Sequence, residues 1–91
     1  MNSEDIQKFL DSKTTEKNRY VKIAFRSRNP IYGLFVKGHS DYAELKSKNF
    51  WRIVPRSQFD SYKESKNIDL AKIFSGSEFS RLTIYEDSFD L

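Results

Sequence analysis

Hydrophobic residues near the start of the chain recur with the spacing of a helix. Ile6, Phe9 and Leu10 follow the i, i+3, i+4 pattern, which places three apolar side chains on one helical face. Ser3 precedes them and is a suitable N-cap, because its hydroxyl can accept a backbone N–H bond. The polar segment 12–18 then interrupts the period. The pattern predicts a short N-terminal helix that packs with this face against the rest of the protein.

The next segment has a period of two residues instead. Val21, Ile23 and Phe25 alternate with Lys22 and Arg26, which is typical of a strand with one face in solvent. We therefore predict the first strand here.

The second predicted strand, residues 31–37, is apolar on both faces. It follows a turn at Pro30, because proline cannot donate to a central ladder. Phe35 lies on one face and Leu34 on the other, so we expect this strand to be covered on both sides. Gly33 lies within the run, where a glycine lets the strand bend sharply or lets another group approach closely.

The remaining pattern predicts one helical turn, a further helix and three further strands. Ser40 can cap the helical turn, and Gly76 lies in the turn between the last two strands. These elements predict an α+β, mainly β fold: a small antiparallel five-stranded curled sheet or barrel with an N-terminal helix and a second short helix. The second helix is expected at 57–65 and the three strands at 50–54, 70–74 and 79–85.

Length and composition limit the classes of protein that fit. A chain of 91 residues with 37% hydrophobic content allows a single domain, residues 1–91, with an ordered core at about 4–86 and an acidic tail at 87–91. So small a core makes self-association a natural source of stability. The chain has no cysteine, no signal-like start and no apolar run long enough to cross a membrane, so we expect a cytoplasmic protein.

Charge is abundant and unevenly distributed. The chain has 16 Lys and Arg against 13 Asp and Glu, a net charge of +3, and six of the basic residues fall between Lys13 and Arg28. The last six residues hold three acids. This gradient indicates either a basic binding face with an acidic tail that competes for it, or an ordinary solvated surface.

The stretches YVKIAFRSRNPIYGLFVKGH and IFSGSEFSRLTIYE, preceded by a helix, resemble the Sm/LSm small-barrel family, including its Hfq-like branch. There a helix precedes five bent strands, a glycine lies in the second strand, as Gly33 does, and a turn glycine precedes the last strand, as Gly76 does. The resemblance covers residues 6–86 and implies a small Sm/SH3-like barrel that forms rings and holds single-stranded RNA. His39 stands where the family has a base-binding aspartate, so the family's nucleotide-binding residues are not carried over.

The whole chain also resembles a group of short uncharacterised bacterial proteins that share patterns like ELKSKNFWRIV and AKIFSGSEF. Some of these proteins bear a short-chain dehydrogenase label. The chain has no G-x-G-x-x-G motif after a strand and no room for a dinucleotide-binding sheet. We therefore reject the dehydrogenase activity for this chain.

Residues that could carry catalysis are few. His39 is the only histidine, and with no cysteine it cannot build the usual metal cluster. Asp41 and Glu44 could share a helical face as a paired acid and base, but such pairs are routine on charged surfaces. We expect no enzyme activity, no cofactor and no metal.

Binding is the better candidate function, because the chain is 15% aromatic and several aromatics adjoin bases. Phe50 and Trp51 point to opposite faces of a strand, and Trp51 could be an exposed stacking platform for a single-stranded nucleic acid. The alternative is that Trp51 packs in the core. We predict a non-catalytic binding or interaction module that meets a protein partner or itself; the alternative is a single-stranded nucleic-acid-binding barrel. The candidate ligand-binding residues are Arg26, Arg28, Lys37, His39, Lys48, Trp51 and Arg52.

Overall fold

The computed structural model describes residues 1–13 and 20–85. The predicted acidic tail 87–91, and Lys17 and Arg19 of the basic run, lie outside these residues. The helices and strands are α1 (Ser3–Lys13), β1 (Tyr20–Phe25), β2 (Ile31–Phe35), α2 (Tyr42–Ser47), β3 (Phe50–Pro55), α3 (Phe59–Ser65), β4 (Lys72–Ser75) and β5 (Phe79–Tyr85). Three short 3₁₀ turns complete the order: η1 (Arg56–Gln58), η2 (Ile68–Leu70) and η3 (Gly76–Glu78).

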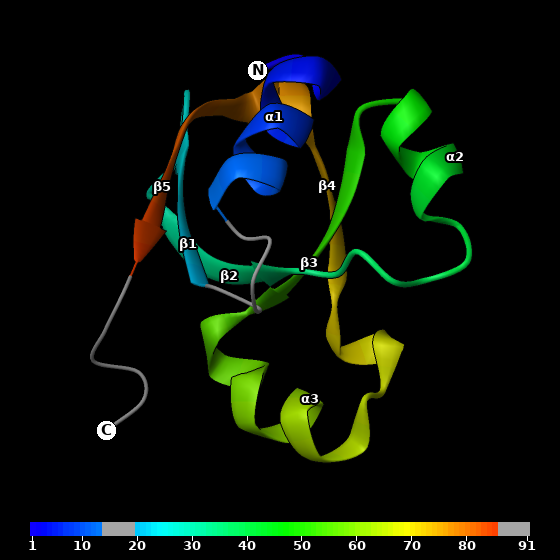
Figure 1. The fold of residues 1–91 in the computed structure, drawn as a ribbon. Coiled ribbons are helices and arrows are strands. Elements are labelled where there is room, and N and C mark those ends of the chain that lie inside the picture. The colour runs from blue at the N-terminus through cyan, green and yellow to red at the C-terminus, as the bar shows by residue number, and fades with distance from the viewer. Residues whose placement is uncertain (14–19, 86–91) are drawn as a thin grey trace.

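The predicted fold class is confirmed: the protein is a small α+β fold with five antiparallel strands in one sheet. The sheet is not closed into a barrel. Its strands curl around α1, with β1 and β5 on one side of the helix and β3 and β4 on the other (Figure 1). None of the helices within the described residues has the length and apolar character needed to cross a membrane.

The strand order is β4-β3-β2-β1-β5, so the first four strands follow one another and β5 returns to pair with β1. Gly76 lies at the turn between β4 and β5, as predicted, but these two strands do not form a hairpin. The 3₁₀ turn η3 carries the chain across to the far side of the sheet. As a result, β4 and β5 are the two edges of the sheet.

Helix α1 contributes one apolar face to the main core. Ile6 and Leu10 are fully buried and Phe9 is partly buried, as the spacing predicts. The predicted cap is wrong by one residue: the side-chain oxygen of Asn2 accepts the backbone N–H of Asp5 at 2.8 Å. Ser3 is instead the first residue of the helix.

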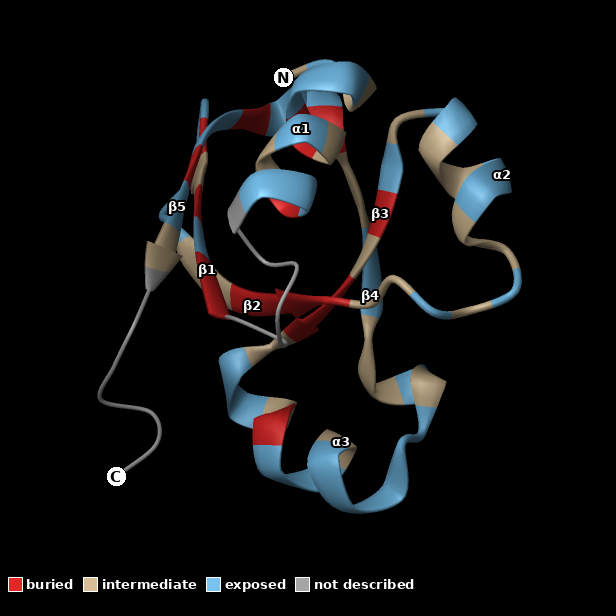
Figure 2. Ribbon diagram, in the orientation of Figure 1, coloured by how far each residue is buried: buried red, intermediate tan, exposed pale blue. Residues whose placement is uncertain are grey.

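The main core lies between α1 and the inner face of the sheet, where the buried positions concentrate (Figure 2). Aromatic rings fill much of it. Phe79 meets Phe25 and Phe35 edge to face, with ring centroids 5.5 and 6.5 Å apart. Such edge-to-face pairs stabilise the core beyond the area that they bury.

Asn49 joins the N-terminal segment to the turn between β4 and β5. Its side chain donates to the carbonyl of Met1 at 2.9 Å and accepts from the indole nitrogen of Trp51 at 2.8 Å. Its carbonyl accepts the backbone N–H of Gly76 at 2.8 Å. A side chain at position 76 would overlap the Asn49 amide. Gly76 therefore allows this buried polar contact as well as the turn.

A second, smaller core lies on the other face of the sheet, under α3. Phe59 of α3 stacks on Tyr20 with ring centroids 4.3 Å apart, and Leu34 and Val54 complete the cluster. Since Phe35 belongs to the main core and Leu34 to this one, β2 is covered on both faces, as its sequence predicts.

Candidate functional site

The segment after β2 brings two of the predicted site residues, His39 and Arg52, into one polar cluster with Asp41. The ring atom Nδ1 of His39 lies 2.8 Å from Oδ1 of Asp41, and Nη1 of Arg52 donates to the same carboxylate oxygen. Arg52 comes from β3, beside the loop that carries the other two residues. Because a guanidinium can only donate, Asp41 is the shared acceptor, and the tautomer of His39 with a proton on Nδ1 also donates to it. In that tautomer Nε2 is the ring nitrogen of His39 that can meet a ligand.

The cluster keeps the carboxyl of Asp41 ionised. The hydrogen bond from Arg52, followed by that from His39, holds the pKa of Asp41 below its ordinary value. Asp41 occupies the N-cap position of α2, yet its side chain makes no capping bond and turns to Arg52 instead. Asp41 therefore fixes the loop and the arginine, and it does not act as a proton donor near neutral pH.

We expect the titration of Asp41 to report this contact directly. Because the folded protein favours the ionised form, the contact stabilises the fold above pH 3.8 and is lost as the pH falls through the lowered pKa. In Arg52→Gln the pKa of Asp41 should rise, as measured by carbon-detected NMR of the carboxyl group. Arg81→Gln, at an exposed position of β5, should leave that pKa unchanged. Identical titration curves in the wild type and Arg52→Gln would contradict the assignment.

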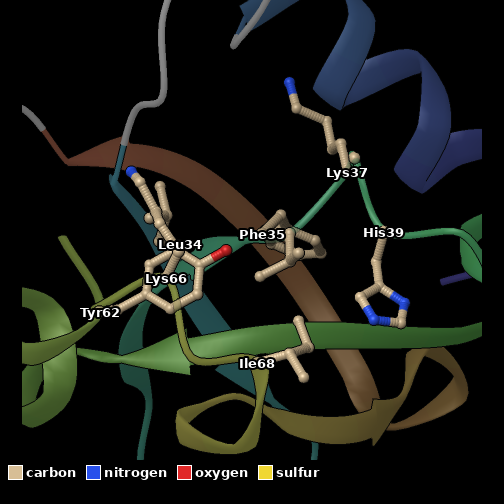
Figure 3. Close-up of a pocket in the computed structure, with 9 residues that line it drawn as sticks. Leu34, Phe35, Lys37, His39, Tyr62, Lys66 and Ile68 are labelled. Atoms are coloured by element: carbon tan, nitrogen blue, oxygen red, sulfur yellow. The ribbon is translucent and has the colours of Figure 1, made fainter. Parts of the chain in front are cut away.

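A pocket of about 330 Å³ adjoins this cluster, between the end of β2 and the end of α3. Figure 3 shows Tyr62 and Lys66 at one end and His39 at the other, with Phe35 and Ile68 between them. The described lining residues combine apolar side chains with basic ones and include no carboxylate. The lining residues are Leu34, Phe35, Val36, Lys37, Gly38, His39, Tyr62, Lys66 and Ile68.

The structure divides the predicted site residues between several places. Lys37 and His39 line the pocket, and Arg52 contacts His39 from outside it. Arg26 and Arg28 are exposed in the turn before β2, which is the opposite end of that strand from the pocket. Arg28 lies over the ring of Phe25, with 4.9 Å between the guanidinium carbon and the ring centroid.

The two remaining candidates do not reach the pocket. Lys48 is exposed and forms a 3.8 Å ion pair with Glu44 along α2. Trp51 is 2% exposed, so the prediction of a stacking platform is wrong and the alternative, packing in the core, is confirmed. As predicted, Phe50 and Trp51 point to opposite faces of β3, but Phe50, which is 38% exposed, is the one that faces outward.

Sequence reasoning missed the part of the pocket that α3, its C-cap and η2 supply, namely Tyr62, Lys66 and Ile68. The spacing of Tyr62 and Lys66, four residues apart, was the available signal, because it places both side chains on one side of a helix end. What brings them to β2 is the packing of Phe59 on Tyr20, which is a tertiary contact. Among the described residues, no group of three or more histidines and acids has the geometry to hold a metal ion.

No protein-family model, no curated protein and no solved structure matches this chain.

Proposed function

We propose that this protein is a non-catalytic interaction module that associates with further copies of itself through the edges of its sheet. The observation that carries the proposal is the part of the outer face of β3 and β4 that α3 does not cover. Phe50 and Ile73 are the large hydrophobic residues left exposed there, at 38% and 51%. Ile73 pairs with Arg52, two residues from Phe50 on the same face, so the two apolar side chains are diagonal neighbours.

Strand pairing supports the same proposal. In the described part of the chain, β4 pairs only with β3 and β5 only with β1, so each leaves one edge unpaired. An open edge is a ready template for another strand. If β4 of one copy lies beside β5 of the next, the contact is heterologous and repeats into a ring or a filament. The resemblance to the Sm/LSm family implies the same kind of assembly.

The test is the molar mass in solution, measured by light scattering over a range of protein concentrations. We expect the wild type to be larger than a monomer and Ile73→Lys to shift it towards the monomer, because a charge would be desolvated in the contact. Ala43→Lys adds the same charge on the exposed side of α2 and should leave the mass unchanged. A wild type that is monomeric at every concentration would overturn the proposal.

The alternative function is binding of single-stranded nucleic acid, and the exposed Arg26 and Arg28 before β2, with the net charge of +3, favour it. Light scattering with a fluorescently labelled, mixed-sequence single-stranded RNA tests this alternative. Binding that weakens steeply as salt rises would support phosphate contacts. An oligomer that ignores RNA at low salt would leave self-association as the function.

A further inference from the structure

We propose that the pocket between β2 and α3 binds a small organic anion, with an aromatic or apolar body and one carboxylate or phosphate group. The proposal does not rest on self-association, since the pocket lies beside α3 and not at an edge of the sheet.

The body of the ligand is inferred from the apolar lining. Leu34, Val36 and Ile68 give three aliphatic side chains, and the rings of Phe35 and Tyr62 give aromatic surface. Ligand pockets typically hold roughly 300 to 1,000 Å³, so about 330 Å³ suits a compact ligand such as one substituted ring.

The anionic group is inferred from the charges around the pocket. Lys37 and Lys66 are the charged side chains among the described lining residues, and His39 adds an imidazole ring. The carboxylate of the adjoining cluster, Asp41, forms an ion pair with Arg52. Among the described lining residues the charged side chains are basic and none is a carboxylate, so the lining favours an anion.

The backbone at Lys66 gives a separate reason to regard this lysine as functional. Lys66 ends α3 in the left-handed conformation, with φ 55°, where glycine is the usual and least strained residue. Its backbone N–H still closes the helix on the carbonyl of Tyr62 at 2.8 Å. A charged side chain is thus kept at a position where stability alone would favour glycine, and that side chain lies at the pocket, 5.7 Å from the Tyr62 ring centroid.

This conflict between stability and binding makes Lys66→Gly the decisive variant. We would titrate the ¹⁵N-labelled protein with phenylacetate and with phenyl phosphate, which share a ring and differ in the anionic group. Two control compounds each lack one part of the ligand: phenylacetamide has the ring without the charge, and inorganic phosphate has the charge without the ring. Saturable shifts at Tyr62 and Ile68 are expected with at least one of the two aromatic anions, and weaker binding is expected with each control compound.

Lys66→Gly should weaken binding about three- to fivefold, the usual effect of one partly exposed charge, while its thermal midpoint stays the same or rises. Lys8→Gln, at an exposed position of α1, removes the same charge elsewhere and should bind like the wild type. The anion that binds with the higher affinity shows whether the pocket prefers a carboxylate or a phosphate group. No saturable binding of either anion, equal binding of phenylacetamide, or unchanged affinity in Lys66→Gly would each overturn the proposal.

Discussion

Replacing Trp51 by alanine is expected to lower the free energy of unfolding by about 3 to 5 kcal/mol, the usual cost of removing a large buried aromatic side chain. The side chain is 2% exposed and packs edge to face on Phe35 and Tyr42, with ring centroids 6.1 and 6.0 Å apart. Its indole N–H donates to Asn49 at 2.8 Å. The change would leave a cavity in the main core and an unpaired amide oxygen.

The measurement is urea unfolding followed by circular dichroism, because the variant has no tryptophan to report by fluorescence. Domains are stable by only about 5 to 15 kcal/mol, so a wild type at the low end of this range would bring Trp51→Ala close to its unfolding transition in water. Trp51→Phe keeps most of the ring volume and isolates the Asn49 hydrogen bond, and we expect it to cost less than alanine. Phe50→Ala, on the neighbouring exposed residue, should change stability far less. Equal costs at positions 50 and 51 would contradict the assigned faces of β3.

These two positions show what alternation can and cannot predict. The sequence places Phe50 and Trp51 on opposite faces of one strand, since successive side chains alternate. It does not say which face meets α1, because that depends on how β3 pairs with β2 and β4. The observed register, with Trp51 opposite Phe74 and Leu34 opposite Val54, decides the matter.

Elements that depend on local pattern were the predictable ones. The helix carrying Ile6 and Leu10, the alternating strand β1 and the doubly covered strand β2 all follow from periodicity. The return of β5 to β1 does not, because a short link such as Ser75–Glu78 is equally compatible with a hairpin. Only the buried contact between Gly76 and Asn49 shows why the chain turns away at this point.

The candidate site was also only partly predictable from the sequence. Lys37 and His39 follow a predicted strand and Arg52 lies within another, so all three could be named from the sequence. Lys66 could not, because its importance comes from an unusual backbone angle and from the docking of α3 on the sheet. Both are results of tertiary packing.

Replacing Gly33 by alanine is expected to destabilise the protein by about 1 to 3 kcal/mol, as overpacking of a tight core does, and valine should cost more. A Cβ built on Gly33 overlaps the Cγ2 of Ile53 and lies 3.3 Å from the carbonyl oxygen of Val54. Ile53 is fully buried, and its Cγ2 branches directly from Cβ, so it cannot swing aside as the end of a long side chain could. Strand β3 would have to move away from β2.

Gly38→Ala is the matched control for this experiment, since a Cβ there meets nothing within 4 Å and no glycine in the described chain has a positive φ. We expect its stability to stay within about 0.5 kcal/mol of the wild type, or to rise slightly because alanine restricts the unfolded chain. Urea unfolding of both variants distinguishes the two reasons for a glycine in an apolar strand. A large loss only at position 33 assigns Gly33 to the close approach of β3. A Gly33→Ala variant as stable as the wild type would exclude that approach and leave bending of β2 as the reason for the glycine.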